Sequence, residues 1–140
     1  MKISARNVLP GKITTVTKGA VNAEVVLSLR GGETFVAVIT NASVDRLGLQ
    51  VGTEAFAIIK ASEVIVAKGL ENAKLSARNI LAGKVTELHE GAVNSEVGIQ
   101  LPGGTMRVAS ITKESLQALD LKRNDLVSAV VKASHVMVGV

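Results

Sequence analysis

The stretch that decides the fold is Lys2-Ile3-Ser4-Ala5-Arg6-Asn7-Val8-Leu9, because it returns as Lys74-Leu75-Ser76-Ala77-Arg78-Asn79-Ile80-Leu81. Two further strings recur: Gly19-Ala20-Val21-Asn22 as Gly91-Ala92-Val93-Asn94, and Lys60-Ala61-Ser62 as Lys132-Ala133-Ser134. Every offset is 72 positions (74 − 2, 91 − 19 and 132 − 60), and roughly 31 of about 67 aligned pairs are identical. This pattern indicates a tandem duplication of one small domain. Polar residues recur as faithfully as apolar ones, so the repeated strings are candidates for function.

The repeat divides the 140 residues into a first domain over 1–68, a linker over 69–72 and a second domain over 73–140. A unit of about 68 residues buries only roughly 60% of its unfolded surface, so it is marginally stable alone. The chain has no Cys for disulfides and only Phe35 and Phe56 as aromatic residues, yet 47% of it is hydrophobic. Such a surplus of apolar side chains favours burial between domains and between chains. We therefore expect a homo-oligomer.

The sequence shows neither a signal-peptide core nor an apolar run of membrane-spanning length, so we expect a soluble, cytoplasmic protein without a membrane partner. The net charge of +4 and the pI of about 9.6 favour an anionic partner. A basic surface that merely keeps the protein soluble would explain the same charge.

Short stretches rich in β-branched residues predict five strands in each unit. The glycines at 31–32 and 103–104 are expected in hairpin turns, and Gly11 at a bend or bulge. A short helix should begin at Thr40 and end near Gly48, with its copy running from Thr112 to Leu119. The expected strands of the first unit cover 5–17, 21–29, 34–39, 54–59 and 63–66. Five strands with one small helix predict an all-β fold of tandem OB-like five-stranded barrels.

Catalysis has little support in the sequence. The only histidines, His89 and His135, align with Thr17 and Glu63 of the first unit, so neither has a repeated partner. No nucleophile–base pair and no metal-ligand spacing accompanies them. We therefore expect no enzyme activity, no catalytic residue, no directly bound metal cation and no cofactor.

The repeated polar strings offer hydroxyl, guanidinium, ammonium and backbone N–H donors, and contain no carboxylate. Such a donor-only set suits a small tetrahedral dianion. The alternative is that Arg6 and Arg78 pair with Glu24 and Glu96 while the serines cap turns. The Gly-Ala-Val-Asn strings are also open to two interpretations, a tight turn or a backbone nest that faces an anion.

Taken together, Ser-Ala-Arg-Asn-x-Leu-x-Gly, Gly-Ala-Val-Asn-x-Glu-Val, Ile-Thr-x-x-Ser and Lys-Ala-Ser closely resemble the molybdate-binding Mop domain of the TOBE group. Two such domains in one chain resemble a di-domain molbindin. The resemblance implies OB-like barrels and a homotrimer with six domains. It also implies that molybdate or tungstate binds at domain interfaces, for storage and homeostasis of molybdenum, with further oxyanion sites near the threefold axis.

The residues that the resemblance assigns to oxyanion binding form two equivalent sets. They are Ser4, Ala5, Arg6, Lys60, Ala61 and Ser62, and Ser76, Ala77, Arg78, Lys132, Ala133 and Ser134. Weaker candidates for the axial sites are Gly19, Ala20, Val21, Asn22, Gly91, Ala92, Val93 and Asn94. The resemblance leaves open whether Arg6 and Arg78 contact the ligand or support the site.

Among the positions at which the two repeats differ are Phe35 against Arg107 and Glu63 against His135. The last difference follows Ser62 and Ser134 directly, so an acid would lie beside one class of site and a histidine beside the other if these side chains face the ligand. The alternative is that strand alternation points residues 63 and 135 away from the pocket. An alternative function for a basic OB-type domain is nucleic-acid binding. Single-strand binders stack bases on aromatic side chains, and this chain has two aromatic residues in all.

Overall fold

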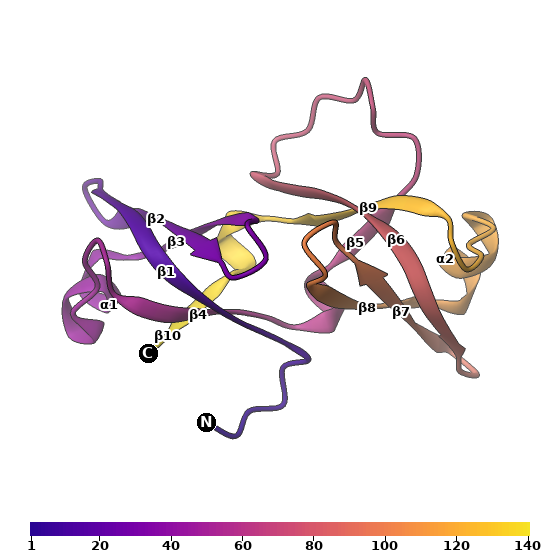
Figure 1. The fold of residues 1–140 in the computed structure, drawn as a ribbon, viewed down its shortest axis with the longest axis horizontal. Helices are drawn as coiled ribbons and strands as arrows, with labels where there is room; N and C mark the ends of the chain where they lie inside the picture. The colour runs from indigo at the N-terminus through magenta and orange to yellow at the C-terminus, as the bar shows by residue number, and fades with distance from the viewer.

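A computed structural model describes all residues, 1–140, as two β lobes joined side by side (Figure 1). Each lobe contains a five-stranded antiparallel sheet. The elements of the first half are β1 (Asn7–Lys18), β2 (Asn22–Leu29), β3 (Thr34–Thr40), α1 (Asn41–Leu47), β4 (Glu54–Ile59), the 3₁₀ helix η1 (Ala61–Glu63) and β5 (Ile65–Ala67). Those of the second half are β6 (Asn79–Glu90), β7 (Asn94–Gln100), β8 (Met106–Thr112), α2 (Lys113–Ala118), β9 (Leu126–Val131), the 3₁₀ helix η2 (Ala133–His135) and β10 (Met137–Gly139). The all-β class and the OB-like tandem are therefore confirmed.

The last strand of each half lies in the sheet of the other half. The strand orders are β10-β4-β1-β2-β3 and β5-β9-β6-β7-β8. In Figure 1 the yellow β10 crosses into the lobe of β1–β4, while β5 joins the lobe of β6–β9. The expectation that residues 63–66 complete their own barrel is wrong in this respect. The 3₁₀ turns at η1 and η2 redirect the chain, and each short strand finds its hydrogen-bonding edge across the junction.

Local signals in the sequence are confirmed for the helices. Thr40 and Thr112 are the N-caps of α1 and α2, and each hydroxyl accepts from the amide three residues later, that of Ser43 or Ser115. Gly48 ends α1 in the left-handed conformation, with φ of 63°.

The bulge lies elsewhere than the sequence suggested. The register of β1 against β2 shifts between Ile13 and Thr15, whereas Gly11 is regularly paired. A Cβ at Gly11 would lie 2.6 Å from the carbonyl oxygen of Ser28. Gly11 is therefore required by the close approach of β2, and not by a bend.

Both halves contribute to one continuous apolar core. The buried cluster includes Val25, Leu27 and Phe35 from the first half together with Val97 and Ile99 from the second. Strand exchange adds Val66 of β5 and places the partly buried Val138 of β10 against this cluster. The halves consequently share buried surface that neither would have alone.

Candidate functional site

The pairing of β1 with β4 brings two of the repeated strings together. Asn7 faces Ile59 in the last pair of this antiparallel register, so Arg6 and Lys60 are the next residues on each side. The same holds in the second half, where Asn79 faces Val131. Sequence segments about 55 residues apart thus end at one edge of each barrel. The polar side chains of these strings are exposed there, whereas Ala5, Ala61 and Ala77 are half-buried and Ala133 is buried.

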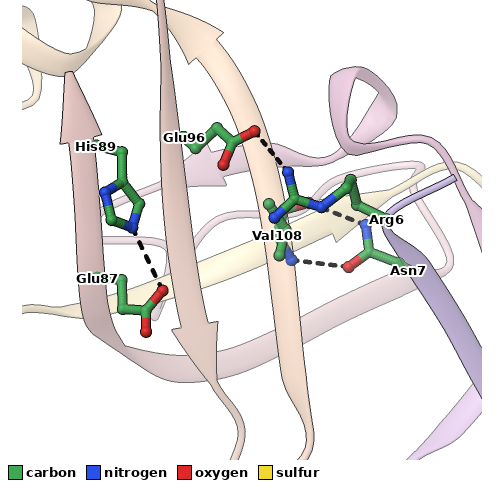
Figure 2. Close-up of polar contacts among 6 residues, drawn as sticks. All are labelled: Arg6, Asn7, Glu87, His89, Glu96 and Val108. Atoms are coloured by element: carbon green, nitrogen blue, oxygen red, sulfur yellow. Dashed lines mark hydrogen bonds and ion pairs between the residues drawn. The ribbon is translucent and has the colours of Figure 1, made fainter. Parts of the chain in front are cut away.

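Both arginines pair with glutamates of the opposite half. An Arg6 Nη1 atom lies 2.6 Å from an oxygen of Glu96, as Figure 2 shows. Arg78 donates to both carboxylate oxygens of Glu24, at 2.7 and 3.3 Å. The pairing alternative raised by the sequence is therefore realised, but across the two halves. The strings themselves contain no carboxylate, and the neighbouring barrel supplies one to each arginine.

Two buried asparagines, which sequence reasoning did not single out, fix these strings to the other half. The Asn7 amide donates to the carbonyl of Val108 at 2.9 Å and accepts from its N–H at 2.7 Å (Figure 2). Asn79 makes the equivalent pair of bonds to Val36, both at 2.8 Å. Each asparagine mimics one more residue of a strand partner. The sequence signal that could have identified these asparagines is their repetition at the end of the Ser-Ala-Arg-Asn strings.

The lysines differ from the arginines because neither Lys60 nor Lys132 forms an ion pair. Both are exposed and precede the 3₁₀ helices η1 and η2, where their carbonyls accept from the N–H of Glu63 and of His135 at 2.9 Å. Their ammonium groups are the uncommitted cations of the two strings. Either can meet an anion without first breaking a salt bridge.

Ser62 also lines a surface groove between the halves. The groove has a volume of about 480 Å³, and Ser110, Thr112 and Ser115 of the second half add hydroxyl groups to an otherwise mainly apolar lining. Neither lysine nor either arginine lines this groove. Within one chain the donor strings therefore form an open edge and not a closed pocket.

Glu63 and His135 contact each other, an arrangement that the sequence did not indicate. His135 Nδ1 lies 2.8 Å from a carboxylate oxygen of Glu63. The two side chains occupy equivalent positions of the two repeats and meet between η1 and η2. The expected contrast, an acid beside one class of site and a histidine beside the other, stays a prediction, and each of the two groups has the other as a partner.

The Gly-Ala-Val-Asn strings form the tips between the first two strands of each half. All eight residues are exposed, and Val21 and Val93 retain 70% and 73% of their accessible surface. In each tip the glycine N–H donates to the asparagine carbonyl, from Gly19 to Asn22 at 2.7 Å and from Gly91 to Asn94 at 2.9 Å. This is the geometry of the tight-turn interpretation. The two apolar tips remain uncovered within the chain.

A buried cation, Arg107, lies between the halves, at a position where the sequence showed a difference between the repeats but not its burial. Arg107 is 1% exposed, and its guanidinium carbon lies 5.1 Å from the centre of the Phe35 ring. Its Nη1 donates to the carbonyl of Met106, while Nε and Nη2 have no partner. Burial lowers the pKa of Arg107 to about 10, and the nearby Glu33 carboxylate opposes this shift. The side chain is charged at neutral pH.

The remaining polar features form no cluster that could hold a metal ion. His89 Nε2 lies 3.5 Å from Glu87 on the same strand, and both side chains are exposed (Figure 2). No three His, Cys, Asp or Glu side chains gather in a way that could hold a metal ion. None of the helices has the length and apolar character needed to cross a bilayer.

Two curated relatives match the chain over almost all of its length. The molybdenum transport protein ModE of Herbaspirillum seropedicae is 39% identical over 140 residues, which is 100% of this chain and 52% of that protein. The molybdenum-pterin-binding protein MopA of Rhodobacter capsulatus is 43% identical over 139 residues, which is 99% of this chain and 52% of that protein. The chain thus spans about half the length of these curated relatives.

A solved structure matches the fold of this chain over its whole length. It is a crystal structure of the cytoplasmic molybdate-binding protein ModG with molybdate bound, 46% identical, with a TM-score of 0.97 over 100% of this chain and 99% of that one. The family model for the TOBE domain matches residues 3–66 and again 75–138. These ranges agree with the repeated halves, and the chain belongs to the TOBE domain family, with two copies of the domain.

Proposed function

We propose that this protein binds molybdate and tungstate as intact oxyanions and serves to store and buffer molybdenum in the cytoplasm. The observation that carries the proposal is the match over the whole chain to the ModG structure, which holds molybdate. The repeated donor strings give a physical reason for the same ligand. Relatives named for molybdenum transport and molybdenum-pterin binding support the ligand class as well.

The proposed oxyanion sites are the two edges where the strings meet. Lys60 and Lys132 supply uncommitted positive charge, while Ser4, Ser62, Ser76 and Ser134 supply hydroxyl donors on exposed side chains. Arg6 and Arg78 act as supports, because Glu96 and Glu24 already hold their guanidinium groups. The exposed edges are completed by a further chain in the proposed homotrimer.

The axial sites would form where the Gly-Ala-Val-Asn tips of several chains come together. Their exposed valines would be covered there, and backbone N–H groups of the tips would face a shared anion. These sites would need the assembled trimer. We propose them as a second class of oxyanion site, in addition to the edge sites that contain Lys60 and Lys132.

Nucleic-acid binding is the less supported alternative. No relative or solved structure described above is named for it, and the two aromatic residues cannot act as stacking platforms. Phe35 is fully buried against Arg107, and Phe56 on strand β4 is half-buried, so no row of exposed rings is available for bases. A binding protein without catalysis is the function that the relatives' names support.

Isothermal titration calorimetry with molybdate, tungstate, sulfate and phosphate tests the proposal. Molybdate and tungstate should bind. Phosphate should bind poorly, because its protonated form carries an O–H that needs an acceptor, and the strings offer donors. Sulfate has no such mismatch, so only its smaller size can exclude it. The proposal is wrong if phosphate competes with molybdate as well as tungstate does. It is also wrong if molybdate gives no binding heat and does not displace another bound oxyanion.

A further inference from the structure

The contacts between the two halves are of two kinds. Contacts of the first kind occur twice. Each joins a residue of one repeat to a non-equivalent position of the other repeat, so the same contact forms again with the two repeats exchanged. Arg6–Glu96 has its copy in Arg78–Glu24, and the bonds of Asn7 to Val108 have their copy in those of Asn79 to Val36. This duplication defines an approximate twofold axis that relates the halves.

Contacts of the second kind occur once, because each joins a position to its own counterpart 72 residues later. They lie along the approximate twofold axis. Thr105 donates to Glu33 at 3.1 Å, the Arg107 guanidinium covers the Phe35 ring at 5.1 Å, and His135 meets Glu63 at 2.8 Å. Gly31 and Gly103 also meet, since a Cβ at Gly103 would overlap the Gly31 carbonyl oxygen, while a Cβ at Gly31 would overlap the side chains of Thr105 and Glu33.

We call a position self-facing when it contacts its own counterpart in the other repeat. At every self-facing position named above that carries a side chain, the two repeats have different residues. The glycine pair is the exception, and its side chains are excluded by space. The differences are chemically matched, since an acceptor meets a hydroxyl donor, a ring meets a cation and a carboxylate meets an imidazole.

A twofold pair made of two identical halves would place each of these residues against its own copy. Two first halves would bring Glu33 against Glu33 and Glu63 against Glu63. Two second halves would bring Arg107 against Arg107 in a buried setting, and His135 against His135. Like charges at such short distances oppose association, most of all where solvent is excluded.

We propose that the self-facing positions 33/105, 35/107 and 63/135 form a pairing code that makes the first half choose a second half, and not its own kind, as its partner. The partner surface is thus a half of this same chain type, with the complementary set of Thr, Arg and His. The code acts on assembly and is independent of which oxyanion the protein binds.

Three variants of the full chain test the code. The first, T105E/R107F/H135E, gives both halves the Glu, Phe and Glu set. The second, E33T/F35R/E63H, gives both halves the Thr, Arg and His set. The third combines all six substitutions, which exchanges the sets between the halves and restores every matched pair in reverse.

Each matching-set variant should lower the thermal unfolding midpoint by at least about 4 °C, and the sixfold variant should recover most of that loss. The exposed pair offers a milder version that does not disturb the core. E63H and H135E should each lower the midpoint, and E63H/H135E should return toward the parent. If the sixfold variant and E63H/H135E are as unstable as the variants that they should rescue, each residue fits its local surroundings and not its partner, and the proposal is wrong.

Discussion

Among single residues, the two lysines that precede η1 and η2 are the sharpest test of the proposed oxyanion site. Replacing Lys60 or Lys132 with Ala removes a charge-assisted contact worth about 1.5–3 kcal/mol, so molybdate affinity at the edge sites should fall roughly 10- to 150-fold. Calorimetric titration measures the change. Lys84→Ala is the matched control, because Lys84 is exposed, forms no ion pair and lies at the opposite end of the β6–β9 register from Asn79. Normal binding by the Lys60→Ala, Lys132→Ala double variant would show that these lysines are merely solvated.

The buried asparagines should matter for stability more than their polarity suggests. In the Asn7→Ala variant the N–H and carbonyl of Val108 lose their partner, and an unsatisfied buried polar group costs about 1–3 kcal/mol. We expect a loss of that size in the free energy of unfolding, measured by urea denaturation. Asn72→Ala in the exposed linker should change the free energy little. An Asn7→Ala variant as stable as the parent would mean that water replaces the amide.

At the scale of elements, the exchanged strands decide how the halves are held together. The two exchanges are not equally anchored. Lys68, directly after β5, forms an ion pair with Asp125 at 2.8 Å and donates to the carbonyl of Asp120 at 2.9 Å. The position equivalent to Lys68 is Val140, and that equivalent to Asp125 is Thr53. Strand β10 therefore lacks this anchor.

The hydrogen bond from Lys68, followed by that from the Lys122 N–H, lowers the pKa of Asp125 below its ordinary 3.8. A carboxyl group with a lowered folded-state pKa stabilises the fold above the unfolded-state pKa and loses this effect as the pH falls through the folded-state value. Asp125→Asn should therefore speed amide hydrogen exchange in β5 at neutral pH. Exchange in β10 should not change.

The same pKa shift sets the pH window of this effect. The stability difference between parent and Asp125→Asn should be constant above about pH 5, decrease as the pH falls below the ordinary pKa of 3.8, and disappear once the pH is below the lowered folded-state pKa. Denaturant midpoints at neutral and acidic pH measure it. A difference that persists when Asp125 is protonated would assign the effect to geometry and not to charge.

For the whole molecule, the surface left after folding predicts assembly. Val21 and Val93 at the tips, and Val51 and Leu126 elsewhere, keep 67–77% of their accessible surface. We expect a homotrimer of six barrels in which the tips are covered. Sedimentation equilibrium should report three chains per particle, and Val21→Asp with Val93→Asp should weaken the assembly. A folded monomer at micromolar concentration would contradict this prediction.

The sequence by itself determined the duplication, the five strands and one helix of each unit, and the residues that cap those helices. These features depend on local chemistry, such as a Thr hydroxyl that accepts an amide three residues later. The sequence also identified the strings that meet at the barrel edge, because a repeat that preserves polar residues marks them without any knowledge of space. The family resemblance was readable from the same strings.

Only the tertiary structure decided whether each contact forms within one half or between the two halves. The exchange of β5 and β10, the crossed pairs Arg6–Glu96 and Arg78–Glu24, and the meeting of Glu63 with His135 all arise across the junction. The two repeats have the same strands in the same order and so offer equivalent edges, and the sequence does not show whether a strand pairs within its own half or with the other half. The choice rests on how the chain turns after Lys60 and Lys132, and on which side chains face their own counterparts across the twofold axis.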